Sequence, residues 1–170
     1  MTNNNNNNNG KKWVFSEASF EKINGTVNDL CSRLKAHVVI FADMNGYPIS
    51  FCGDTRRIDM NNLTAVGAGT FSATAEMAHL VHEKQQFKYI YHEGESQNIY
   101  LCNVGEDYLM IIVFSKNTAV GMVRALTAHA VKKLSGLLSD LQVEKEKATE
   151  FLDDEFRSLL GKELDKSFRF

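Results

Sequence analysis

The sequence predicts an α/β (α+β) sandwich, in which a five-stranded antiparallel sheet carries helices on both faces. Three observations predict it. Segments with apolar residues at helical spacing predict the helices. An Asn-Gly pair joins two segments rich in β-branched residues, and short glycine-containing links join three further predicted strands. The expected order is helix, two strands, helix, three strands, helix. The chain has 170 residues, 44% apolar and 24% charged, which suits one domain core rather than two.

The first helix is expected to begin at about residue 15. Ser16 can cap it, because a serine side chain accepts a hydrogen bond from a free N–H group of the first turn. Apolar residues then follow at three- and four-residue spacing, which places them on one helix face: Phe20, Ile23, Val27, Leu30 and Leu34. Residues 1–14, with asparagine from 3 to 9, are expected to form a disordered tail.

A β-hairpin should follow, with strands at 38–42 and 47–52. Its turn is Asn45-Gly46, a pair in which both residues accept positive φ. Pro48 comes directly after the turn, and a proline cannot donate to a strand ladder. The second strand is therefore predicted at the edge of the sheet.

The second helix has the most unusual composition in the chain. Asp59 can cap it, and it is expected to run to about Glu83. Between Thr64 and Ala75, ten of twelve residues are Gly, Ala, Ser or Thr. A glycine inside a helix costs about 1 kcal/mol relative to alanine. Gly67 and Gly69 therefore favour the close approach of another backbone or a flat partner, and the alternative is ordinary packing of this helix under its own sheet.

Three more strands are predicted at 87–93, 98–104 and 108–114, joined as antiparallel hairpins. The last strand is apolar throughout, so it should lie centrally with helices on both faces. A third helix from Thr118 to Leu141 can cover one face. The domain thus spans 15–143, and 144–170 is a tail with an amphipathic segment expected to dock on a partner through Phe151, Leu152, Phe156, Leu159 and Leu160.

This element order resembles the roadblock/dynein-light-chain family. The strings at 91–94, 112–114 and 117–124, which read Tyr-His-Glu-Gly, Ile-Val-Phe and Asn-Thr-Ala-Val-Gly-Met-Val-Arg, are similar to its MglB branch. The resemblance covers about Ser16 to Leu141, and the acidic, aromatic segment near the C-terminus is also similar to the tail of that branch.

The resemblance implies a roadblock-type sandwich that forms a homodimer through its second helices, with the sheets joined edge to edge. It also implies binding of a Ras-like GTPase of the MglA type, with two adaptor chains per GTPase. Hydrolysis is then stimulated by ordering the GTPase's own catalytic residues, and the C-terminal segment can affect nucleotide exchange. On this reading the chain is no enzyme, has no catalytic residue or cofactor of its own, and acts in cell polarity and motility. GTP, GDP and magnesium belong to the GTPase.

The expected GTPase or dimer interface is the second helix. It comprises Leu63, Val66, Gly67, Ala68, Gly69, Thr70, Phe71, Ser72, Ala73, Thr74 and Met77. Which of these residues face the twin chain and which face the GTPase cannot be decided from spacing.

Other candidate chemistry is weaker. Arg56 and Arg57 could be imagined as an arginine finger, but nothing near them in sequence organises a site, so solvated loop charges are favoured. Arg124 is expected to be structural or interfacial. The spacing of His79, His82 and Glu83 permits a metal site, yet no third ligand is evident and none is expected. Gly67 and Gly69 lack the rest of a phosphate-binding motif.

Two rival functions stay open on the sequence alone. One is a passive roadblock scaffold, and the other is a sensory module of the PAS or GAF kind that encloses a ligand. A formal charge of −2 gives no basic face for nucleic acid or anionic membranes. The sequence shows no signal peptide, long apolar run or paired cysteines, so the protein is expected in the cytoplasm. Localisation at a cell pole is left open.

Overall fold

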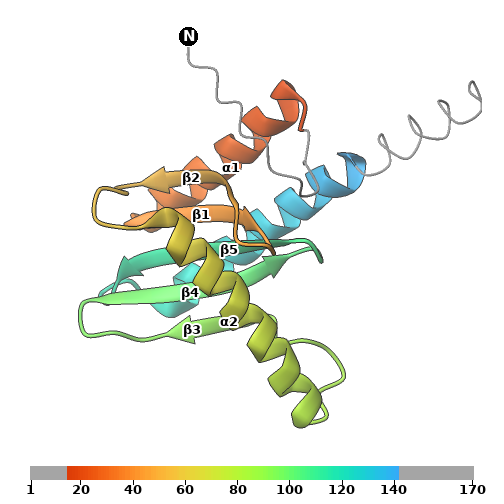
Figure 1. Ribbon diagram of the computed structural model, residues 1–170. Helices are drawn as coiled ribbons and strands as arrows, with labels where there is room; N and C mark the ends of the chain where they lie inside the picture. Colours follow the sequence, from red (N-terminus) through yellow and green to blue (C-terminus); the bar gives the residue numbers. More distant parts are fainter. Residues whose placement is uncertain (1–14, 142–170) are drawn as a thin grey trace, which may run out of the picture.

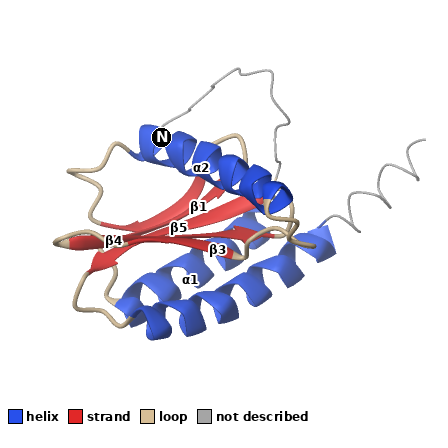
Figure 2. Cartoon of the chain, turned by 90° about the horizontal axis from the view of Figure 1, so that it is seen from below, coloured by secondary structure: helices blue, strands red, loops and turns tan. Residues whose placement is uncertain are grey.

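A five-stranded antiparallel sheet separates two helical layers in the computed structural model, which describes residues 15–141 (Figure 1). Helix α2 covers one face of the sheet, and α1 lies with the C-terminal helix on the other (Figure 2). The order of elements confirms the prediction. The elements are α1 (Glu17–Leu34), β1 (Val38–Asp43), β2 (Pro48–Gly53), α2 (Met60–Leu80), β3 (Tyr89–His92), β4 (Gln97–Val104), β5 (Tyr108–Ser115) and the C-terminal helix (120–141).

Helix α1 begins where its sequence indicates. The Ser16 side chain accepts a hydrogen bond from the Ser19 N–H, and Lys35 closes the helix in the left-handed conformation. Of the five apolar residues predicted to face the core, Phe20 differs, because it remains 40% exposed in the second turn. The other four are fully or almost fully buried: Ile23, Val27, Leu30 and Leu34.

An acidic side chain at the end of β1 stabilises the β1–β2 hairpin. The Asp43 carboxylate accepts hydrogen bonds from the backbone N–H groups of Asn45 and Tyr47, at 3.0 and 2.8 Å. Gly46 has a φ of +86°, as the Asn-Gly turn requires. The sheet order is β2-β1-β5-β4-β3, so Pro48 lies in an edge strand as predicted.

Strand β5 occupies the centre of the sheet, paired with β1 and β4. All its residues from Tyr108 to Phe114 are buried. Because side chains alternate along a strand, Met110, Ile112 and Phe114 pack beneath α1 and the C-terminal helix, while the residues between them pack beneath α2. The prediction that helices cover both faces of this strand is confirmed.

Helix α2 ends at Leu80, three residues before the predicted Glu83. The backbone N–H of Glu83 bonds to the Ala78 carbonyl and that of His82 to the His79 carbonyl, a Schellman closure with His82 at a φ of +57°. No glycine marks this stop, so no local signal predicted it.

No helix within residues 15–141 is long and apolar enough to cross a bilayer.

Candidate interaction surface on helix α2

The inner face of α2 packs against the sheet of its own chain. Ala68 and Phe71 are 5% and 2% exposed, in one apolar cluster with β5. A Cβ atom at Gly67 would lie 2.6 Å from the Ile111 Cδ1 atom and 3.3 Å from a Leu101 methyl. The missing side chain at Gly67 therefore lets the helix lie close to the sheet, which is an internal reason for that glycine.

The N-terminal end of α2 is fixed to the hairpin turn. The Thr64 hydroxyl is fully buried and donates to the Gly46 carbonyl. A Cβ atom at Gly46 would lie 2.6 Å from the Ala65 Cα atom, so the turn and the helix are in direct backbone contact. This contact sets the position of the helix along the sheet, and with it the side that α2 turns to solvent.

The outer face of α2 carries one continuous line of residues, which we call the outer stripe: Val66, Gly69, Ala73, Met77 and Leu80. Their spacing of three and four residues places them on one side of the helix. Val66 is 66% exposed, Met77 58% and Leu80 72%. Among residues 15–141 a Cβ atom at Gly69 would meet nothing within 4 Å, so this part of the chain gives no internal reason for the glycine.

The hydroxyl groups beside the outer stripe are already satisfied within the helix. Thr70, Ser72 and Thr74 donate to backbone carbonyls four residues earlier, at 2.8, 3.1 and 2.9 Å. Covering a hydroxyl that has no partner is costly, but these three can lose their water without losing a hydrogen bond. The outer face of α2 is therefore suited to burial against another polypeptide.

The C-terminal end of α2 extends past strand β3 at the edge of the sheet (Figure 1). Exposed apolar side chains gather in this part of the chain, where Val81 (64% exposed) and Phe87 (37%) follow Met77 and Leu80. In the described sheet, β3 is an edge strand that pairs with β4 on one side only. An apolar helix end and an open strand edge are thus found together.

The eleven residues predicted for the interface divide by helix geometry. A helix that packs on a sheet turns one side toward it, and Gly67, Ala68 and Phe71 lie on that side, in the core of the single chain. Three others are half-buried: Leu63, Thr70 and Thr74. Five are exposed: Val66, Gly69, Ser72, Ala73 and Met77.

The interface prediction also left out residues that the structure adds to this surface. Leu80 continues the helical spacing of Met77, and that signal could have included it. Val81 and Phe87 follow the helix, and no periodicity marks them. The five predicted docking residues between 151 and 160 lie outside the described part of the chain.

The arginines near α2 do not converge on a site. The Arg56 guanidinium holds the Asp54 carboxylate with two hydrogen bonds, at 2.7 and 2.9 Å, and lowers the pKa of that carboxyl group to about 2. Both side chains are exposed, so this pair shapes a surface loop. Arg57 is exposed in the same loop. Arg124 lies on the opposite helical layer, with its guanidinium carbon 4.8 Å from the centre of the Tyr89 ring.

Helix α2 ends between His79 and His82, the two histidines whose spacing could suit a metal ion. His79 is helical, whereas His82 has left-handed backbone beyond the last turn, so the two do not share a helix face. Among residues 15–141, no three His, Cys, Asp or Glu side chains are placed to hold a metal ion. The three cysteines, Cys31, Cys52 and Cys102, are free thiols.

Residues 26–114 match the Roadblock/LC7 domain, and the chain belongs to that family. Within the family it resembles the MglB branch. MglB of Myxococcus xanthus is 32% identical, with a TM-score of 0.71 over 75% of this chain and 96% of that one. The gliding protein MglB of Thermus thermophilus is 21% identical, with a TM-score of 0.70 over 76% of this chain and 97% of that one. A further MglB, described in a tetrameric arrangement, is 20% identical, with a TM-score of 0.70 over 76% of this chain and 96% of that one.

Proposed function

We propose that this chain is a non-enzymatic regulator of a Ras-like small GTPase, acting as a homodimer whose paired α2 helices form the GTPase-binding surface. The observation that carries the proposal is the outer stripe of α2, in which a Cβ atom at Gly69 would meet no described residue within 4 Å. Similarity to MglB supports the kind of partner, a GTPase of the MglA type. Two adaptor chains per GTPase, and an action in cell polarity, are parts of the same proposal.

The dimer is proposed from the end of α2 and the edge of β3. A two-fold axis beside β3 would pair this strand with its copy and continue the sheet across the boundary. The copy's α2 would then pack beside the overhanging end of α2 and cover Met77, Leu80 and Val81. One symmetric contact thus removes both an open edge and an exposed apolar patch of each chain.

The GTPase would contact the side of the paired helices that faces away from both sheets. Gly69 has no side chain and Ala73 only a methyl group, so a switch region of the partner can come near the helix backbone on this side. We propose that such contact orders the GTPase's own catalytic residues, with GTP, GDP and magnesium held by the GTPase. Arg56, the first candidate for an arginine finger, already pairs with Asp54. An effect of the C-terminal segment on nucleotide exchange belongs to the same proposal.

Addition of this protein to a GTP-loaded MglA-type GTPase is expected to accelerate phosphate release. The measurement is single-turnover release of inorganic phosphate, with complex formation followed separately by sedimentation. An accelerated rate supports the proposal. A complex with an unchanged rate would favour the passive scaffold instead, and a chain that binds no Ras-like GTPase would contradict the proposal.

Gly69→Ala is expected to stabilise the single chain and weaken the complex. Replacing a helix-interior glycine by alanine adds about 1 kcal/mol to stability where space is free, as it is here. The same methyl group would separate two surfaces that meet at the glycine backbone. Urea unfolding and GTPase binding measure the two effects.

Gly25→Ala is the matched control, because Gly25 is also an exposed helical glycine with nothing within 4 Å, but on α1. It should raise stability equally and leave binding unchanged. Equal binding by the Gly69 and Gly25 variants would show that no partner approaches Gly69 closely.

A further inference from the structure

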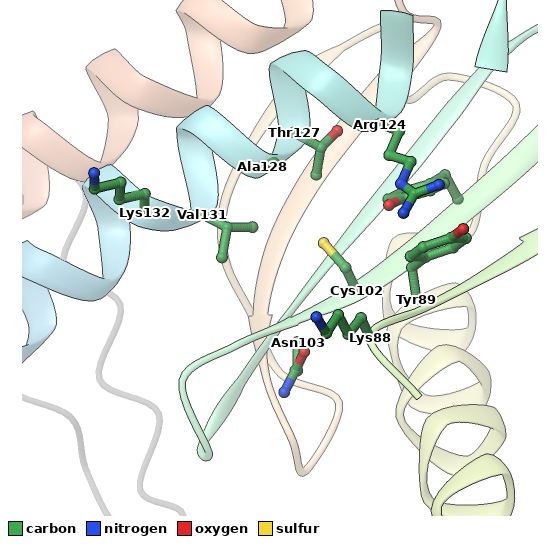
Figure 3. A pocket seen from close by; sticks show the side chains of 10 residues that line it. Lys88, Tyr89, Cys102, Asn103, Arg124, Thr127, Ala128, Val131 and Lys132 are labelled. Atoms are coloured by element: carbon green, nitrogen blue, oxygen red, sulfur yellow. The ribbon is translucent and has the colours of Figure 1, made fainter. Parts of the chain in front are cut away.

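A pocket of about 400 Å³ lies between the C-terminal helix and strands β3 and β4 (Figure 3). It is on the sheet face opposite α2, away from the proposed GTPase surface. Its volume falls in the range of about 300–1,000 Å³ typical of small-molecule sites. Val131 and Ala128 give it an apolar wall on the helix side, and Tyr89 and Cys102 line the strand side.

The pocket lining carries three positive side chains and no acidic one: Lys88, Arg124 and Lys132. Within residues 15–141, none of the three forms an ion pair, because the two salt bridges there join Arg33 to Asp29 and Arg56 to Asp54. Contact with the Tyr89 ring restrains the Arg124 guanidinium without neutralising it. Burial raises the pKa of the Cys102 thiol to about 12, so no thiolate offsets these charges at neutral pH.

A buried hydroxyl group in the pocket lacks a hydrogen-bond partner in the described part of the chain. Thr127 is 1% exposed, and among residues 15–141 its Oγ1 atom is the buried side-chain oxygen or nitrogen left unpaired. Thr70 and Thr74 on α2 donate to their own helix, but Thr127 does not. Its oxygen lies on the side toward Arg124 (Figure 3). An unpaired buried hydroxyl costs stability that a bound acceptor would restore.

We propose that this pocket binds a small phosphate monoester, with Arg124 and Thr127 contacting the phosphate and Lys88 and Lys132 attracting it at the rim. Three cations that form no ion pair within residues 15–141 match a dianion better than a single carboxylate. The apolar wall around Val131 would hold the organic part of the ligand. The site is independent of GTPase binding, and it gives the MglB-like fold a ligand pocket of the kind that a sensory module would use.

Calorimetric titration of the full-length protein tests the site with phenyl phosphate and AMP, and with phenol and adenosine as their uncharged counterparts. Both phosphates are expected to bind and both uncharged compounds to fail. Arg124→Met should weaken phosphate binding about tenfold, since a charged hydrogen bond is lost. Thr127→Val keeps the shape of the side chain and should weaken it several-fold.

Two lysine variants separate binding from folding. Lys132→Met alters an exposed rim residue, so the fold should persist while phosphate binding weakens. Lys133→Met removes the neighbouring charge, which does not line the pocket, and should change nothing. Failure of both phosphates to bind the wild-type protein would overturn the proposal, as would wild-type affinity in the Arg124 and Lys132 variants. Displacement of the phosphates by an acidic peptide that binds more tightly would reassign the pocket to a protein segment.

Discussion

Ala73→Arg is expected to abolish GTPase stimulation while leaving the fold intact. Ala73 is exposed in the middle of the outer stripe, between Gly69 and Met77. A long charged side chain there would hold the partner away from the helix and would lose its hydration if the surfaces closed. In a symmetric dimer the substitution also occurs twice. A loss of several kcal/mol is the usual scale for such a mismatch, which corresponds to at least about 100-fold weaker binding.

The measurement for Ala73→Arg combines phosphate release with sedimentation and a thermal melt. The melting temperature should stay close to that of the wild type, because the new side chain points into solvent. Ala125→Arg is the control, since Ala125 is an exposed alanine of the C-terminal helix on the other face of the sheet. If the Ala73 variant dimerises and stimulates hydrolysis like the wild type, α2 is not the contact surface.

Ala68→Arg is expected to destabilise the chain by about 3–5 kcal/mol, the scale of an unpaired buried charge. Ala68 is only five positions before Ala73 on the same helix, but it is 5% exposed and packs in the cluster that contains Phe71 and Ile111. An arginine there must either bury its charge or lift α2 from the sheet. A large fall in the urea midpoint, seen without any partner present, is the expected result.

The two variants make a matched pair, because each places arginine for alanine in α2. The position nearer the sheet tests the packing of the helix, and the outer position tests its contacts with other chains. An unchanged urea midpoint for Ala68→Arg would mean that α2 does not lie on the sheet as described. Loss of folding in Ala73→Arg would mean that the outer stripe is internal.

Local signals in the sequence were sufficient for most of the elements. Ser16 begins α1, Asn45-Gly46 makes the hairpin turn, and the unbroken apolar run of β5 indicates a central strand. The cap and the turn depend only on residues a few positions away. An unbroken apolar strand fits the centre of a sheet that is covered on both faces. The order of elements followed from these signals, and the expected family rested on the resemblance of that order and of the strings at 91–94, 112–114 and 117–124.

Only the tertiary structure decided how the small residues of α2 divide between two environments. Gly67 and Gly69 are the same residue type two positions apart in one helix, yet Gly67 packs against Ile111 and Gly69 faces away from the sheet. The difference depends on the rotation of α2 over the sheet, which is set by Thr64 and Gly46, eighteen residues apart in sequence. The pocket beside Thr127 arises in the same way, from a helix and two strands whose charges are scattered along the chain. Sequence patterns record periodicity, but the phase of a helix over a sheet is fixed by contacts between distant segments.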